Sequence, residues 1–220
     1  MKTLILSTLV LLATSNIAFS QFSVNLGLTS NYIARGTSQT LGGVGYSFGV
    51  DYAFKNGFYV GSWTSNVDFG DGTDQEIDGW IGYRHTINNW NLDYSFSLFG
   101  YTGDPVSYEM VEGRIILSRT FDKWTFTEVA AYSPDYFNIL DQSVWLESSI
   151  AFAITDKLSI SGGVGHQYIE GGGSYACGNI GVGYKFSNHF SLDIRYSDTN
   201  DHSQGKAWES AVSVSLKATF

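Results

Sequence analysis

Apolar and polar residues alternate along almost the whole chain after residue 20. From Val44 to Phe54, for example, every second residue is apolar or aromatic, and the residues between them are small or acidic. A period of two places alternate side chains on opposite faces of a β-strand. About twelve runs of this kind follow one another, at 22–29, 44–54, 58–67, 77–83, 90–98, 109–118, 124–132, 144–152, 158–164, 176–186, 190–196 and 208–220. The pattern therefore predicts an all-β chain of about twelve antiparallel strands.

The connections between these runs alternate in length. Tight turns lie near residues 55, 87, 122, 156 and 188, and the first of them, Lys55-Asn56-Gly57, carries a strong hairpin signal. Longer polar loops lie near 35–43, 68–75, 100–108, 133–141, 169–174 and 199–206. Outer-membrane barrels have short turns at the periplasmic rim and long loops at the outer rim. This alternation favours a transmembrane antiparallel up-and-down β-barrel over a soluble β-sandwich, in which the apolar faces would share one core.

Aromatic residues are expected to form two bands at the ends of the strands. One band lies beside the tight turns, at Phe54, Phe58, Tyr83, Trp90, Phe121, Trp124, Phe152, Phe186, Phe190 and Phe220. The other lies beside the long loops and includes Tyr32, Trp63, Tyr101, Tyr108, Tyr132, Tyr168, Tyr196 and Trp208. Two such bands are typical of the aromatic girdles at the two surfaces of a membrane. They predict contact with outer-membrane lipid and lipopolysaccharide.

The first twenty residues have the pattern of a signal peptide. Lys2 precedes an apolar stretch over 4–12, and Ala18-Phe19-Ser20 offers small residues at a cleavage point before Gln21. The apolar stretch is well short of the ~20 residues that cross a bilayer as a helix. We therefore expect a cleavable signal peptide at 1–20, export through the periplasm and one outer-membrane β-barrel domain at 21–220. The last strand ends at Phe220, which resembles the C-terminal signal that the barrel-assembly machinery reads.

Composition excludes several classes of protein. The formal net charge of -9 argues against nucleic-acid binding, which needs a basic face, and the single cysteine, Cys177, excludes an internal disulfide. Of the 4 histidines, His202 is the one with Asp201 and Ser203 beside it. Adjacent side chains in a loop diverge, so we expect no enzyme, with an outer-membrane lipid hydrolase or acyltransferase as the catalytic alternative. The acidic loop at 68–76 does not match EF-hand spacing, and we expect no metal and no cofactor.

Three segments resemble a known family. Residues 30–40 read Ser-Asn-Tyr-Ile-Ala-Arg-Gly-Thr-Ser-Gln-Thr, residues 56–67 read Asn-Gly-Phe-Tyr-Val-Gly-Ser-Trp-Thr-Ser-Asn-Val, and residues 132–137 read Tyr-Ser-Pro-Asp-Tyr-Phe. They resemble the TorF family of outer-membrane porins, the first at its N-terminal signature, with Ala34 in place of a larger residue. The resemblance extends over essentially the whole chain after the signal peptide. It implies an outer-membrane barrel and, by association only, a channel.

Charged residues on the polar phase of the strands are the candidates for the pore lining. They are Asp51, Glu76, Asp78, Arg84, Asp93, Glu112, Arg114, Glu147, Asp193, Arg195 and Glu209. Charges inside a barrel are tolerated where they meet water or pair with one another. Arg35, just beyond the first strand, is the candidate for the pore mouth. A water-filled lumen predicts passive diffusion of small hydrophilic solutes through a monomeric barrel, and the surplus of acids predicts a mild cation preference.

Two other hypotheses stay open. Arginine–carboxylate pairs, such as Arg114 with Glu112, can fill a narrow barrel that conducts nothing, because about twelve strands lie between filled eight-stranded barrels and open porins. Alternatively, the long loops can serve binding or adhesion at the cell surface. A continuous water path through the lumen favours the channel, and a closed lumen favours a structural or loop-binding role. A converged cluster of Ser, His and carboxylate favours the enzyme.

Overall fold

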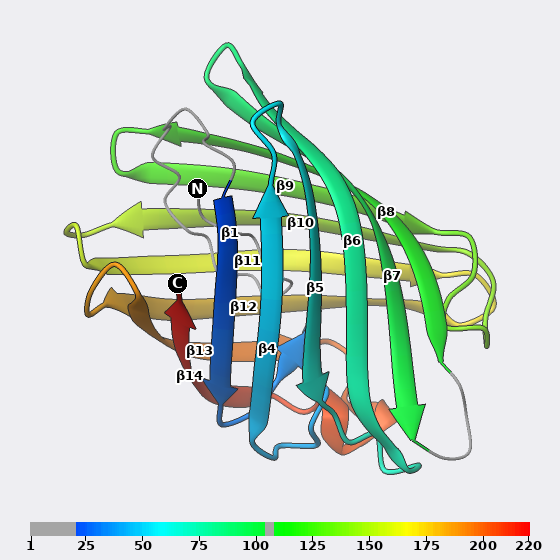
Figure 1. The fold of residues 1–220 in the computed structure, drawn as a ribbon. Helices are drawn as coiled ribbons and strands as arrows, with labels where there is room; N and C mark the ends of the chain where they lie inside the picture. Colours follow the sequence, from blue (N-terminus) through cyan, green and yellow to red (C-terminus); the bar gives the residue numbers. More distant parts are fainter. Residues whose placement is uncertain (1–20, 104–107) are drawn as a thin grey trace.

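The computed structural model describes residues 21–103 and 108–220, and these fold into a closed antiparallel β-barrel (Figure 1). Within these ranges twelve strands form the wall: β1 (Gln21–Thr29), β4 (Gly45–Ala53), β5 (Phe58–Asn66), β6 (Thr73–Ile87), β7 (Trp90–Gly103), β8 (Glu109–Phe121), β9 (Trp124–Ser133), β10 (Ser143–Ala153), β11 (Leu158–Ile169), β12 (Gly173–Lys185), β13 (Phe190–Thr199) and β14 (Ala211–Thr219). The predicted signal peptide at 1–20 lies outside the described residues. The prediction of an all-β barrel of about twelve strands is confirmed.

Each wall strand pairs with its neighbours in the chain, and the first closes the ring on the last. β1 pairs with β4 on one side and with β14 on the other. The amide of Val24 also donates to the carbonyl of Phe220 (2.9 Å), so the two ends of the wall meet. In the turn between β6 and β7, Asn88 and Asn89 have φ of 49° and 65°, as a two-residue hairpin of type I′ requires. None of the helices in the described ranges has the length and hydrophobicity needed to cross a bilayer.

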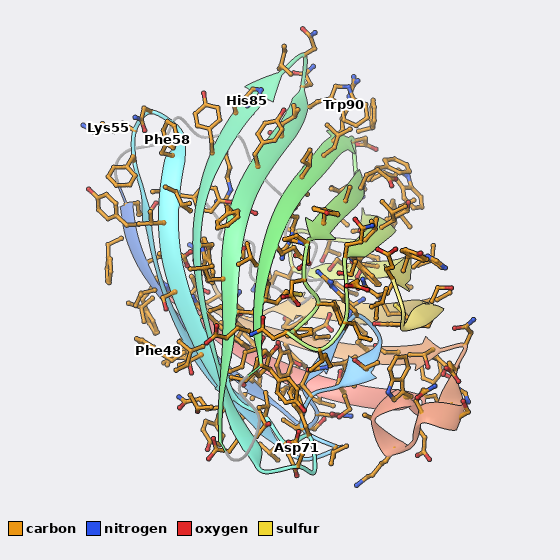
Figure 2. All side chains as sticks on the ribbon, turned by 90° about the vertical axis from the view of Figure 1, so that its right-hand side faces the viewer. Phe48, Lys55, Phe58, Asp71, His85 and Trp90 are labelled. Carbon is orange, nitrogen blue, oxygen red and sulfur yellow. The ribbon has the colours of Figure 1, made fainter. Side chains whose placement is uncertain are left out.

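Outward side chains are mainly apolar and inward side chains mainly polar. Figure 2 shows Phe48 and Phe58 pointing away from the barrel, with Lys55 and Trp90 at the tight-turn rim and Asp71 at the opposite rim. Every wall strand exposes at least one large hydrophobic side chain, whereas many buried side chains are Ser, Thr, Asn, Asp or Glu. This arrangement reverses that of a soluble β-sandwich and is typical of a barrel surrounded by lipid.

The outer-rim aromatic band has fewer members than the sequence predicts. Three of the predicted members lie in a buried inward cluster of Tyr32, Trp63, Val67, Phe99, Tyr101 and Met110. Trp63 on β5 and Tyr101 on β7 occupy the lumen phase of their strands, beside the loop that follows β1. Tyr132, Tyr168 and Tyr196 are exposed on the outer face. The prediction was wrong for the inward members because a segment of chain inside the lumen offers these rings an apolar partner.

Candidate functional site

A short β-hairpin from the first long loop lies inside the barrel (Figure 1). Its strands are β2 (Ile33–Ala34) and β3 (Thr37–Ser38), joined by Arg35 and Gly36. The two turn residues have φ of 49° and 85°, the left-handed values of a type I′ turn. Each strand has two residues, which is too short to show a period of two, so the alternating pattern does not predict the hairpin.

The base of the hairpin is fixed to the loop that carries it. The amide of Gln39 donates to the carbonyl of Tyr32 (2.7 Å), and the hydroxyl of Ser38 donates to Oδ1 of Asn31 (2.6 Å). The ring of Tyr32 packs edge-on against Trp63 on β5, with the centroids 5.6 Å apart. These contacts hold the base of the hairpin beside β5, and the tip extends from there across the lumen.

The tip of the hairpin is bound by strands on the other side of the lumen. Arg35 Nη2 lies 2.5 Å from Glu112 Oε2 on β8, and Arg35 Nη1 donates to Gln167 Oε1 on β11 (2.9 Å). The Arg35 guanidinium also lies over Trp145 on β10, 5.1 Å from the ring centroid. Arg114 binds the second carboxylate oxygen, with 2.7 Å between its Nη2 and Glu112 Oε1. We call these five residues the Arg35 latch.

Burial makes the Arg35 latch costly to break. The side chain of Glu112 is 1% exposed, and Gln167 is fully buried. A buried carboxylate is tolerated when charged donors satisfy both oxygens, as Arg35 and Arg114 do here. The indole ring of Trp145 lies against Gly165 on the neighbouring strand β11. A Cβ at position 165 would lie 2.2 Å from this ring, so only glycine leaves room for it. The local sequence therefore supplies both the charge and the space that the latch needs.

The Arg35 latch separates two chambers in the lumen. One has a volume of about 140 Å³ and is lined mainly by β1, β4 and β12 to β14, and the other has about 230 Å³ and is lined mainly by β6 to β10. Arg35, Trp145 and Glu147 line both chambers. Much of the remaining lining is hydroxyl-bearing, with Ser47, Ser65, Ser191, Ser197, Ser213 and Ser215 in the first chamber and Ser95, Ser97, Ser118, Thr120, Thr125, Thr127 and Ser149 in the second. Each chamber is large enough for several water molecules, which need roughly 10–15 Å³ each.

The other arginines on the wall strands' lumen side are also bound to carboxylates. Arg84 Nε lies 2.5 Å from Asp93 Oδ2, and the Arg84 guanidinium stacks over Tyr59, 3.9 Å from the ring centroid. Arg195 Nε lies 3.0 Å from Asp193 Oδ1. These positive charges are therefore neutralised within the wall.

Two inward acids on β6 are not paired in this way. Glu76 accepts a hydrogen bond from the Tyr101 hydroxyl through Oε1 (2.9 Å). Its Oε2 and the Oδ1 of Asp78 are buried and receive no hydrogen bond from the part of the chain that the structure describes. Neither Glu76 nor Asp78 forms an ion pair with a described residue, whereas Arg84 and Arg195 each bind one carboxylate and Arg35 and Arg114 share the carboxylate of Glu112.

Ten of the charged residues predicted to line the pore lie on the inward phase of their strands. They are Asp51, Glu76, Asp78, Arg84, Asp93, Glu112, Arg114, Glu147, Asp193 and Arg195. The prediction was wrong for Glu209. This residue follows η2 (Lys206–Trp208) and is exposed in the loop before β14, which begins only at Ala211. Arg35 lies within the lumen, deeper than the predicted pore mouth. Trp145 and Gln167 were not predicted as site residues, because only charged side chains were selected. Their positions in the alternating pattern do place both side chains on the inward face of the wall.

His202 and its neighbours do not form the arrangement that acyl transfer requires. His202 Nε2 lies 2.8 Å from Asp198 Oδ1, and this hydrogen bond raises the pKa of His202 above its ordinary value. The hydroxyl of Ser203 donates to Asp201 (2.5 Å), so it is directed to an acid and not to the histidine. Residues 45–49 read Gly-Tyr-Ser-Phe-Gly, as in a nucleophile elbow, but they lie within strand β4 and not at a strand-to-helix turn.

Cys177 is expected to report whether the hairpin is seated. Gly36 lies against it, since a Cβ at position 36 would be 2.4 Å from the Cys177 Cβ. We expect Arg35→Ala to loosen the hairpin and to speed the reaction of Cys177, the single cysteine of the chain, with a hydrophilic maleimide several-fold. Mass spectrometry of the refolded protein measures the rate. Arg84→Ala, which frees Asp93 and leaves the hairpin seated, should react at the native rate. Equal rates for all three proteins would contradict the contact.

The fold is similar to that of solved porins. The KdgM porin aligns with a TM-score of 0.59 at 13% identity, over 90% of this chain and 99% of that chain. The NanC porin aligns with a TM-score of 0.60 at 10% identity, over 91% of this chain and 99% of that chain. An outer-membrane channel from Pseudomonas putida F1 aligns with a TM-score of 0.60 at 10% identity, over 93% and 96%. At these identities the likeness shows a shared fold and no more.

Sequence comparison places the chain in a family. No curated protein matches the sequence. A family model matches residues 13–220, which is nearly the whole chain, and it is described as a bacterial protein of unknown function, Gcw_chp. The match does not confirm the TorF name that the sequence motifs suggest, so that name stays a prediction. The chain belongs to the Gcw_chp family.

Proposed function

We propose that the protein is an outer-membrane channel through which small hydrophilic solutes diffuse passively. The observation that carries the proposal is a closed barrel whose inward side chains are mainly polar, with chambers lined in part by hydroxyl groups on both sides of the Arg35 latch. The similarity to the KdgM and NanC porins supports it, and one KdgM structure is described as a complex with oligogalacturonate. The apolar outer face suits contact with lipid and lipopolysaccharide. The barrel-assembly machinery would read the last strand, which leads to Phe220.

The inward charges support a mild preference for cations. Arg84, Arg114 and Arg195 are each bound to a carboxylate, whereas Glu76 and Asp78 keep buried oxygens without hydrogen bonds from the described chain. Acidic side chains around a pore favour the entry of cations. Because most inward charges cancel in pairs, the preference should be mild.

Single-channel recording in a planar bilayer under a salt gradient tests both parts of this proposal. The refolded chain from Gln21 should give steady unitary currents, with a reversal potential of the sign that cation flow produces. Replacing Glu76→Gln together with Asp78→Asn should move the reversal potential toward zero, because two inward acids that have no ion-pair partner among the described residues are removed. Asp201→Asn removes an acid from an outer loop and should leave the potential unchanged. The absence of channel currents from protein that gel mobility shows to be folded would contradict the channel. A reversal potential of the sign that anion flow produces would contradict the charge argument.

One observation favours a second candidate, a non-conducting barrel with a structural role or with loops that bind a surface partner. The Arg35 latch crosses the lumen and places the hairpin between the two chambers. If the hairpin fills the lumen at its level and never moves, no water path passes it, and the long loops become the functional part of the molecule. The same recordings separate the two candidates, since the native barrel is then silent and removal of the hairpin makes it conduct.

A further inference from the structure

The outer wall around β9 and β10 carries polar groups where lipid chains are expected. Glu128 on β9 and Ser148 on β10 are direct cross-strand partners on the outward face. The Ser148 hydroxyl donates to Glu128 Oε2 (2.5 Å), and both side chains are exposed. His166 on β11 lines the same shallow groove. Most other outward positions at this level of the wall are apolar, for example Leu117, which pairs with Glu128.

Glu128 lies near the middle of the apolar band. On the same outward face of β9, Trp124 and Tyr132 lie four residues before and four residues after it, and both rings are exposed. At a rise of about 3.3 Å per residue, each ring is roughly 13 Å from Glu128 along the strand. If these rings mark the two membrane surfaces, the carboxylate faces the hydrocarbon core, where an uncovered acid is costly and marks a functional position.

The same part of the wall has a groove and a ridge side by side. Ala130 on β9, Ser148 on β10 and Ala176 on β12 have short side chains and line the groove. Beside them Leu146 and Val164 protrude, with 52% and 66% of their surfaces exposed. Short side chains let two backbones approach closely in a membrane, and a ridge next to a groove can fit a copy of itself.

We infer that this wall, which we call the Glu128 face, is the interface with a second copy of the chain. The inference rests on the membrane location proposed above. Two copies inserted in one direction can only be related by an axis along the membrane normal, so residues at similar depth meet. Glu128 and Ser148 are one strand spacing apart, about 4.8 Å, and lie at similar depth. A two-fold axis between β9 and β10 therefore places each Ser148 opposite the partner's Glu128.

A second copy fits the Glu128 face better than lipid chains do. Acyl chains offer the carboxyl group of Glu128 no polar contact, whereas across a two-fold axis the two Ser148–Glu128 pairs face each other and each hydroxyl can donate its one proton to either Glu128. The donor and the acceptor lie on one wall, as do the ridge and the groove, and this self-complementarity is what a two-fold interface requires. The monomer expected from the sequence leaves the carboxylate facing lipid.

Disulfide cross-linking in liposomes tests which wall meets the partner. In a Cys177→Ser background, Ala130→Cys on the Glu128 face should form a disulfide-linked dimer under mild oxidation. Leu26→Cys on β1, which the strand order places on the far side of the barrel, is the matched control and should stay monomeric. Equal cross-linking at both positions, or none at position 130, overturns the inference. Channel recordings of the same proteins do not depend on this outcome, so failure of the interface and failure of the channel are distinguishable.

Glu128→Leu tests the hydrogen bonds themselves. The variant places an apolar side chain in lipid and should fold at least as well as the native chain. Dimerisation, measured by fluorescence transfer between labelled barrels at falling protein-to-lipid ratio, should weaken about tenfold or more. Leu146→Val, a small change of the ridge that keeps the polar pair, should weaken it less. A folded Glu128→Leu barrel that dimerises like the native protein overturns the inference.

Discussion

Replacement of residues 33–37 by two glycines is expected to raise the single-channel conductance several-fold. The change removes Arg35 and the tip of the hairpin, which reach across the lumen to Glu112 and Gln167. The chambers of about 140 and 230 Å³ can then join in one water path. The current through a narrow pore is limited by its narrowest section. Removal of the hairpin tip should therefore change the current more than removal of any single lumen charge.

The deletion is placed so that the barrel can still fold. The Gln39 amide already donates to the Tyr32 carbonyl (2.7 Å), so two glycines and Ser38 suffice to span the gap. Tyr32 keeps its contact with Trp63 at the base. Arg195→Ala is the matched control, because it removes an inward positive charge and leaves the hairpin in place. Its conductance should stay close to that of the native barrel.

The outcomes show whether the hairpin limits the current through the barrel. Arg35→Ala alone should give an intermediate increase, since the guanidinium is lost and the backbone of the tip remains. A folded deletion variant that conducts like the native chain would show that the hairpin does not limit the current. A native barrel that is silent, together with a deletion variant that conducts, would identify the hairpin as a plug and favour the structural role for the native protein.

The wall of the barrel is predictable from the sequence because it depends on local pattern. In a strand such as β4 (Gly45–Ala53), the alternation of side chains and the following Asn56-Gly57 turn specify both the faces and the end of the strand. The same logic holds around the ring, where each strand pairs with its neighbours in the chain. Most of the fold is therefore predictable, because each strand forms its hydrogen bonds with the strands that precede and follow it in the sequence.

The Arg35 latch is not predictable in the same way. Arg35 is separated by 77 residues from Glu112 and by 132 residues from Gln167. No local pattern reports a contact over such a distance, and β2 and β3 are too short to show alternation. The one local signal is the Arg35-Gly36 pair, whose positive φ angles suit a tight turn. The resemblance of residues 30–40 to a family signature marks this segment as important without showing where it lies.

Glu112→Ala is expected to lower the free energy of unfolding by about 3–5 kcal/mol, the typical cost of removing one partner of a buried ion pair. It leaves the side chains of Arg35 and Arg114, which are 17% and 11% exposed, without their shared carboxylate. Glu112→Gln keeps one carbonyl oxygen as an acceptor and should cost less. Urea unfolding of the refolded barrel in lipid vesicles measures the difference. Glu109→Gln, at an exposed position of the same strand, should have little effect.

A double-mutant cycle with Arg35→Ala shows whether the lost stability belongs to the Arg35 latch. The two residues share a contact, so the double variant should lose less stability than the sum of the two single losses. Glu112→Ala leaves the charges of Arg35 and Arg114 without a carboxylate partner, and Arg35→Ala removes one of these two charges. Arg114 keeps its position in both backgrounds and serves as the constant part of the cycle. Strictly additive losses would mean that Arg35 and Glu112 do not stabilise each other. The hairpin would then be held by its base at Tyr32 and Ser38 alone.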